Sequence, residues 1–183
     1  RRERRRRMNP AAKKLLSLFA SILIAVPLYI LLHEGGHGLV AVLCGARITD
    51  FSILGAYMRY EGGVFSPLAL SLFHAAGMLL PVLLSVVYML AYRTERTGVF
   101  YRIFSFVSLL IPVGSLLAWV IVPVLYMAGQ APPDDDVTKL ISSSGLSPWI
   151  VLLGAIALFA VCLSIAWRKK ILQNYWTAVK SDG

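Results

Sequence analysis

The sequence predicts an all-α polytopic membrane protein with about four transmembrane helices and a short re-entrant β-hairpin between the first two. Three observations lead to this fold class. Hydrophobic residues make up 58% of the 183 residues. Several apolar runs reach the roughly 20 residues that span a bilayer as a helix. A glycine-bounded segment with spaced aliphatic and aromatic residues separates the first two runs, as is typical of a hairpin.

The apolar runs place the membrane helices at about residues 15–44, 67–92, 99–128 and 148–167. Prolines interrupt the first three runs, and lipid-embedded helices tolerate such interruptions because neighbouring groups satisfy the freed carbonyls. We expect one membrane-embedded domain over residues 15–170, preceded by a basic segment at 1–14 and followed by a tail at 171–183.

The basic residues predict the orientation in the membrane. Of the 18 Lys and Arg residues, only Arg47, Arg59 and Lys139 fall on the side opposite the termini, which leaves 15 with the termini. Cytoplasmic segments carry the excess of basic residues, so we expect a multi-pass protein of the cell membrane with both termini in the cytoplasm. The basic N-terminus is expected to bind anionic lipid, and no nucleic-acid partner is expected.

A polar motif, His33-Glu34-Gly35-Gly36-His37, lies inside the first apolar run. On a helix the two histidines are four residues apart and project from one face, where both imidazoles can bind one Zn²⁺. Glu34 is then placed to act as the general base toward water. Placing a carboxylate within an apolar membrane segment costs free energy, which favours a functional motif over a chance match. A decayed or purely structural site is the alternative.

The hairpin is expected over residues 45–63, where apolar residues alternate between glycines. A free strand edge there could pair with an extended peptide. We therefore predict that Phe51, Ile53 and Tyr57 contact substrate. An exterior loop with interfacial aromatic residues is the alternative reading.

These segments, with the Gly45-Ala46-Arg47 turn and Ala75-Ala76-Gly77 in the second helix, resemble the site-2 protease-like family of intramembrane zinc metalloproteases, nearest to its small bacterial members. The resemblance implies zinc bound by two histidines and a distant aspartate, with the glutamate as base and the hairpin presenting an unwound substrate helix. Three features depart from the family. Its L-D-G sequence is absent, Met78 and Pro81 depart from its A-G-P motif, and many members hold zinc near the cytoplasmic face.

The resemblance also directs attention to Asp134-Asp135-Asp136, which follow the third apolar run where the family's aspartate would come. Asp135 and Asp136 are the candidate third metal ligands. Alternatively, acidic residues here cap a short helix from Val137 to Ser143.

His74, the third histidine, lies about 12 Å into the second helix, level with His37 by the helical rise. It is a candidate third ligand or a donor that stabilises the tetrahedral intermediate. A polar side chain bonded across a helix pair is the simpler alternative.

The function predicted from these observations is cleavage of a peptide bond in a transmembrane protein or peptide by a zinc metalloendopeptidase. The alternative is a catalytically inactive membrane scaffold or an accessory subunit of a larger complex. Neither reading fixes the oligomeric state, so an oligomer or larger complex stays open.

Overall fold

The structure, a computed structural model, describes residues 9–180 as six helices and one two-stranded sheet. In chain order the elements are α1 (Pro10–Leu43), β1 (Ala46–Ser52), β2 (Tyr57–Gly62), α2 (Pro67–Ala91), α3 (Val99–Met127), α4 (Asp136–Ser144), α5 (Pro148–Arg168) and α6 (Ile171–Lys180). The predicted helical fold with one hairpin is therefore present.

Four helices, α1, α2, α3 and α5, are long and apolar enough to cross a membrane. Three of them match the predicted spans to within a residue at each end. The prediction for the first was wrong at its start, because α1 begins at Pro10 rather than near residue 15. Asn9 caps it by accepting a hydrogen bond from the Ala11 backbone N–H at 2.9 Å, and Pro10 suits the first helical position.

The outer faces of these helices are apolar. On α1, Leu15, Phe19 and Leu23 are all exposed. Contiguous exposed apolar surface of this kind is unusual on a soluble monomer but is what lipid-facing helices require. The exposed side chains thus agree with the helix lengths in indicating a membrane protein.

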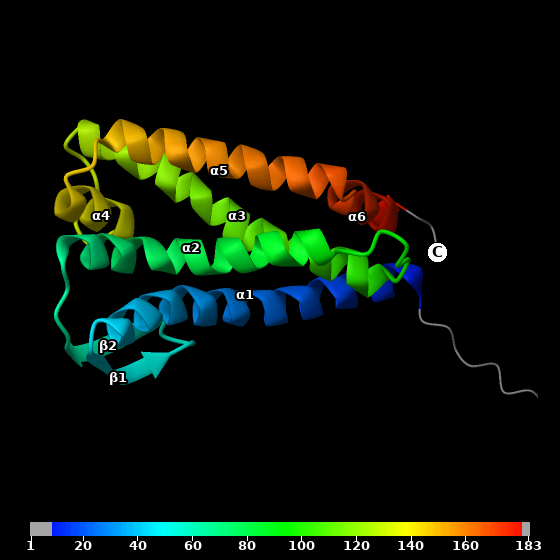
Figure 1. Ribbon diagram of the computed structural model, residues 1–183. Helices are drawn as coiled ribbons and strands as arrows, with labels where there is room; N and C mark the ends of the chain where they lie inside the picture. Colours follow the sequence, from blue (N-terminus) through cyan, green and yellow to red (C-terminus); the bar gives the residue numbers. More distant parts are fainter. Residues whose placement is uncertain (1–8, 181–183) are drawn as a thin grey trace, which may run out of the picture.

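The long helices lie side by side, with the hairpin and α4 at one end of the bundle (Figure 1). We call this the site end, and it also holds His37. The opposite end, called the basic end, holds the start of α1, the α2–α3 connection and α6 (Figure 1). α1 packs against α2 and α3, while α5 packs against α3.

The two predicted terminal segments differ from the structure in their inner parts. Residues 10–14 belong to α1, and residues 1–8 lie outside the described part of the chain. Residues 171–180 form α6, which packs against α3 and buries Ile171 and Ala178. The C-terminal segment is therefore joined to the helical domain through most of its length.

The hairpin pairs β1 with β2 antiparallel, with Ala46 opposite Gly62 and Ser52 opposite Tyr57. An irregularity in the register lies between Ile48 and Asp50. The turn from α1 into β1 is made at Gly45, whose φ of 84° is available to glycine at little cost. The strands pack back against α1, so the hairpin is held beside the helix that carries the histidine motif.

α1 and α2 approach each other closely at two glycines. A Cβ on Gly36 would overlap the Ala76 carbonyl, and a Cβ on Gly77 would overlap the ring of His37. Small residues allow helix backbones to approach in this way in membranes. The contact places the backbone of α2 directly against the histidines of α1.

α4 is a short amphipathic helix with one buried face. Asp135 caps its start, since its Oδ1 accepts a hydrogen bond from the Val137 N–H at 2.8 Å. Val137, Leu140 and Ile141 are buried at the spacing that puts them on one helical face. Burial of that face against α2 and α3 fixes the rotation of α4.

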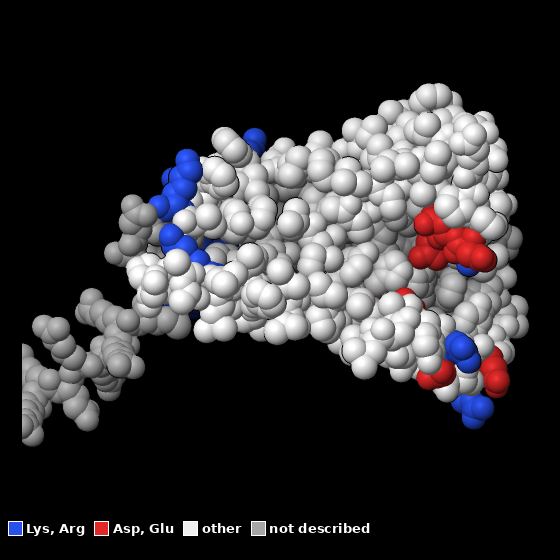
Figure 2. Space-filling model, turned by 180° about the vertical axis from the view of Figure 1, so that it is seen from behind, with Lys and Arg blue, Asp and Glu red and all other residues white. Residues whose placement is uncertain are grey.

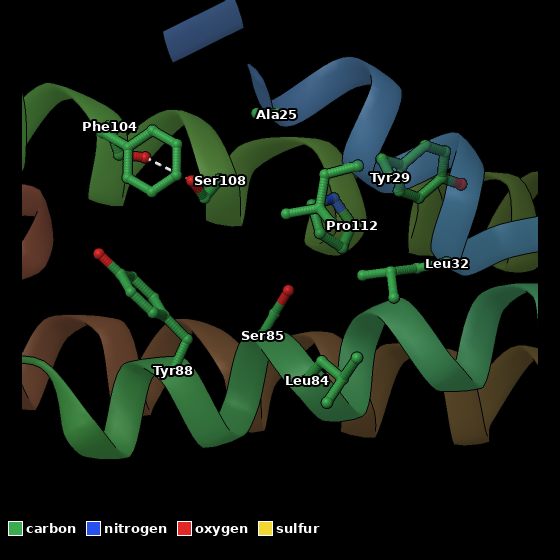
Figure 3. A pocket seen from close by; sticks show the side chains of 10 residues that line it. Ala25, Tyr29, Leu32, Leu84, Ser85, Tyr88, Phe104, Ser108 and Pro112 are labelled. Atoms are coloured by element: carbon green, nitrogen blue, oxygen red, sulfur yellow. Dashed lines mark hydrogen bonds between the residues drawn. The ribbon is translucent and has the colours of Figure 1, made fainter. Parts of the chain in front are cut away.

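A cavity of about 120 Å³ lies between α1, α2 and α3 (Figure 3). Its walls are mainly apolar, and three of the four hydroxyl groups that line it are bonded within the protein. Ser85 donates to the Pro81 carbonyl, Ser108 donates to the Phe104 carbonyl, and Tyr88 is bonded to Ser105. Among the described residues, no acidic, basic or histidine side chain lines this cavity.

The helix crossing predicts different effects for the two neighbouring glycines of the motif. Gly36→Ala should lower the free energy of unfolding by about 1–3 kcal/mol, because its methyl group would collide with the Ala76 backbone. Gly35→Ala is the matched control, since a Cβ there meets nothing within 4 Å. Its free energy of unfolding should be unchanged or raised by up to about 1 kcal/mol. Denaturant unfolding of the detergent-solubilised variants measures both, and equal losses would contradict the proposed crossing.

Candidate metal centre

Three side chains from two helices converge at the site end: His33, His37 and Asp136. His37 Nε2 lies 3.3 Å from His33 Nε2 and 3.1 Å from Asp136 Oδ2. His33 Nε2 lies 3.5 Å from the same oxygen. The two histidines meet because they are four residues apart on α1, and Asp136 reaches them from the first turn of α4. These three residues could hold a metal ion.

A hydrogen bond fixes the His37 ring. Its Nδ1 lies 2.7 Å from the Phe73 backbone oxygen, which can only accept, so Nδ1 carries the proton. Nε2 faces His33 and Asp136, and it is the nitrogen through which the neutral ring can bind a metal. Metal-binding histidines are commonly oriented by a bond of this kind from the other ring nitrogen to a backbone carbonyl.

The structure separates the two candidate acidic ligands. Asp136 joins the histidines, whereas the carboxylate of Asp135 caps α4 and does not belong to the three-residue group. This difference follows from the way α4 packs. Its buried face, formed by Val137, Leu140 and Ile141, fixes the rotation of the helix, and its first residue, Asp136, is then directed at the histidines. Burial raises the pKa of Asp136, but hydrogen bonds and charge interactions with His33 and His37 outweigh it, so the pKa lies well below its ordinary value.

His74 lies beside the three-residue group on α2 and is outside it. Its Nδ1 is 4.0 Å from Asp136 Oδ1, the oxygen that does not face His33 and His37. The sequence-based expectation that the three histidines share one level of the bundle agrees with this placement.

A cavity of about 500 Å³ opens onto the three-residue group. Its lining is polar and aromatic, and comes from α1, the hairpin, α2 and the α4 region. The lining residues are His33, Glu34 and His37, then Ala56, Tyr57, Met58 and Tyr60, then Phe73 and His74, and finally Asp134, Asp136 and Lys139. Glu34, the expected base, therefore borders the same space as the candidate metal ligands.

The hairpin lines this cavity mainly through its second strand. Of the three predicted substrate contacts, Tyr57 is among the lining residues, while Phe51 and Ile53 are not. Tyr57 donates a hydrogen bond to Asp50 at 2.9 Å, and this bond raises the pKa of Tyr57. Tyr60 and Phe73 pack edge to face with centroids 5.4 Å apart, which ties β2 to α2.

Most acidic side chains gather at one end of the molecule. Figure 2 shows acidic side chains, with some basic ones among them, beside a hollow at this end, and basic side chains at the other. Within residues 9–180 the acids of the site end are Glu34, Asp50, Glu61, Asp134, Asp135 and Asp136. Asp134 and Lys139, both lining the cavity, lie 3.9 Å apart. The candidate metal centre thus lies at the acidic end of an apolar bundle.

Sequence reasoning missed several contributors to this site. The Phe73 carbonyl orients His37, and a backbone group leaves no signal in residue identities. Lys139 follows Asp136 by three residues and shares its helical face, so the period of α4 could have indicated it. Met58 lies next to Tyr57 on β2, but the alternating pattern does not say which strand faces the histidines.

Comparison of the chain with protein-family models, curated proteins and solved structures finds no match. The functional argument therefore depends on the residues and geometry of this chain.

The three consecutive aspartates allow a direct test of the metal centre. Asp136→Asn should lower bound divalent metal at least tenfold, because it removes the carboxylate that faces both histidines. Asp134→Asn and Asp135→Ala should retain the metal. Asp135→Ala should instead lower the free energy of unfolding of the metal-free protein by about 1 kcal/mol, through loss of the cap. Elemental analysis and denaturant unfolding measure the two effects. If Asp135→Ala lost the metal and Asp136→Asn retained it, Asp135 rather than Asp136 would be the metal ligand.

Proposed function

We propose that this protein is a zinc-dependent endopeptidase that cleaves a peptide bond of a transmembrane protein or peptide. The observation that carries the proposal is the spacing of the three candidate ligand atoms, 3.1, 3.3 and 3.5 Å. Zinc bonds of about 2.0–2.2 Å in a tetrahedral arrangement place ligand atoms about 3.3–3.6 Å apart. The three distances are close to these values.

The donor set also fits zinc. Two imidazole nitrogens and one carboxylate oxygen leave a fourth position open, which is the pattern of catalytic rather than structural zinc sites. The hydrogen bond at His37 Nδ1 supports this fit, since a neutral ring held in this way offers Nε2 as its metal-binding atom. Zinc, when bound, polarises a peptide carbonyl and makes water a stronger nucleophile at neutral pH.

Glu34 is the proposed general base. It follows His33 directly and lines the cavity shared by the two histidines and Asp136. In the proposed mechanism its carboxylate takes a proton from the attacking water and delivers it to the leaving amine nitrogen. The motif and its setting resemble the site-2 protease-like family, in which this glutamate has that role.

The hairpin is the proposed substrate clamp. A helical substrate hides its backbone in its own hydrogen bonds and must unwind before attack. β2 pairs only with β1 among the described strands, and its residues Tyr57, Met58 and Tyr60 border the cavity. The free edge of β2 can therefore pair with an extended substrate segment beside the metal ligands.

We further infer that the hairpin is re-entrant. Ala56, in its turn, lines a cavity with Tyr29, Ile30 and Glu34. These α1 residues lie more than two turns before the end of the helix at Leu43. The turn of the hairpin thus lies below the end of α1, at the depth of the proposed chemistry.

Orientation in the membrane follows from charge. The basic end is proposed to face the cytoplasm and anionic lipid, and the site end the opposite side. Within residues 9–180, the basic end holds Lys13, Lys14, Arg93, Arg96, Arg102, Arg168, Lys169, Lys170 and Lys180.

Glu34→Gln tests the mechanism. The variant should fold and retain zinc, because Glu34 is not among the three grouped residues, yet lose proteolysis by at least a hundredfold, because an amide cannot accept the proton. Cleavage of a transmembrane substrate in proteoliposomes and zinc content measure the two properties.

Full activity in Glu34→Gln would remove this mechanism. Zinc-loaded wild-type protein that cleaves no membrane substrate would instead favour the inactive scaffold or accessory subunit.

Cysteine labelling tests the orientation. In a background without Cys44 and Cys162, Arg59→Cys and Lys139→Cys should react with an impermeant thiol reagent added outside intact cells. Arg96→Cys should react only after lysis, because it lies in the α2–α3 connection at the basic end. The reverse pattern would place the proposed zinc site on the cytoplasmic side.

A further inference from the structure

His74 is a partly buried polar residue with no role in the mechanism described above. Its side chain is 12% exposed, and its Nδ1 is shielded from solvent with no hydrogen-bond partner among residues 9–180. A buried nitrogen without a partner costs free energy, so its position needs an explanation. Asp136 Oδ1, a carboxylate oxygen, lies 4.0 Å from it.

The two oxygens of Asp136 face different partners. Oδ2 faces His33 and His37, and Oδ1 faces His74. A carboxylate that binds a metal through one oxygen needs a donor at the other to hold its plane, and such outer partners strongly affect metal affinity. A shift of about 1 Å would bring His74 Nδ1 within hydrogen-bond distance of Oδ1.

We propose that His74 is a positioning residue that donates its Nδ1 proton to Asp136 Oδ1 and so directs Oδ2 toward His33 and His37. The inference rests on the proposed metal site and assigns this histidine a role within it. His74 is on α2 and Asp136 on α4, so the bond also joins the two helices that pack together at the site end.

The same geometry argues against the two other roles for His74. A direct ligand would face the space between Oδ2 and the two Nε2 atoms, but His74 Nδ1 faces the other oxygen and is outside the three-residue group. A donor to the tetrahedral intermediate would need a proton on Nε2. A neutral imidazole that donates from Nδ1 carries no proton there.

Two amide substitutions distinguish the ring nitrogens. The amide nitrogen of Asn lies close to the place of a histidine Nδ1, and that of Gln lies close to the place of Nε2. His74→Asn should therefore keep zinc affinity within about threefold of wild type, while His74→Gln and His74→Ala should lose about 10–100-fold. Competition with a chromophoric chelator on the purified full chain measures the affinity. Ser71→Ala, one turn earlier on α2, is the matched control, because its hydroxyl bonds only to the Pro67 carbonyl.

Each other outcome overturns the inference. Equal losses in His74→Asn and His74→Gln would make His74 a direct ligand, and unchanged affinity in His74→Ala would make it a packing residue. If the Gln and Ala variants do not fold, as judged by thermal unfolding in chelator, the Asn variant decides alone, since loss of affinity there contradicts a donor at Nδ1. If the wild-type protein binds no zinc, the proposed function is overturned together with this inference. The wild-type measurement therefore separates failure of the proposed function from failure of the inference alone.

Discussion

The close crossing of α1 and α2 is the constraint on which the rest of the site depends. Gly36 lies against the Ala76 carbonyl, and Gly77 lies against the imidazole rings, so any larger residue at these points would separate the helices. Because α2 approaches so closely, the Phe73 carbonyl reaches His37 Nδ1 and sets its tautomer. In a membrane, where apolar surface does not drive helices together, such packing of small residues supplies the association.

α4 adds the third candidate ligand, Asp136, to the two histidines at this crossing. Its apolar residues Val137, Leu140 and Ile141 are buried, and this burial fixes its rotation. Asp135 is used at the cap, and Asp136 is therefore the acid that faces the histidines. A charged group taken from water is tolerated only when partners compensate it, and the two histidines provide them. Stability of the short helix and geometry of the site thus depend on the same two neighbouring aspartates.

The sequence predicts the long elements well, since an apolar run of more than 20 residues in a bilayer can only be a helix, and glycines bound the hairpin. The spacing of His33 and His37 predicts their shared face for the same reason. What the sequence could not distinguish is Asp135 from Asp136, because capping and ligation need the same side chain and only the packing of α4 decides. It also could not show that β2 rather than β1 borders the cavity, since Phe51 pairs with the lining residue Met58 and alternation along the strands does not distinguish the two strands.

The location of the proposed chemistry follows from where water can reach. The cavity between α1, α2 and α3 is small and mainly apolar, and no charged side chain of the described residues lines it, so it suits apolar contents (Figure 3). The cavity at the site end is lined by Glu34, Asp136 and Lys139 and opens beside the hairpin. Hydrolysis consumes water and requires a charged base, both of which are costly at the centre of a bilayer. Under the proposed function, a substrate helix would therefore bring its scissile bond to this end of the bundle, where the free edge of β2 can hold it once it has unwound.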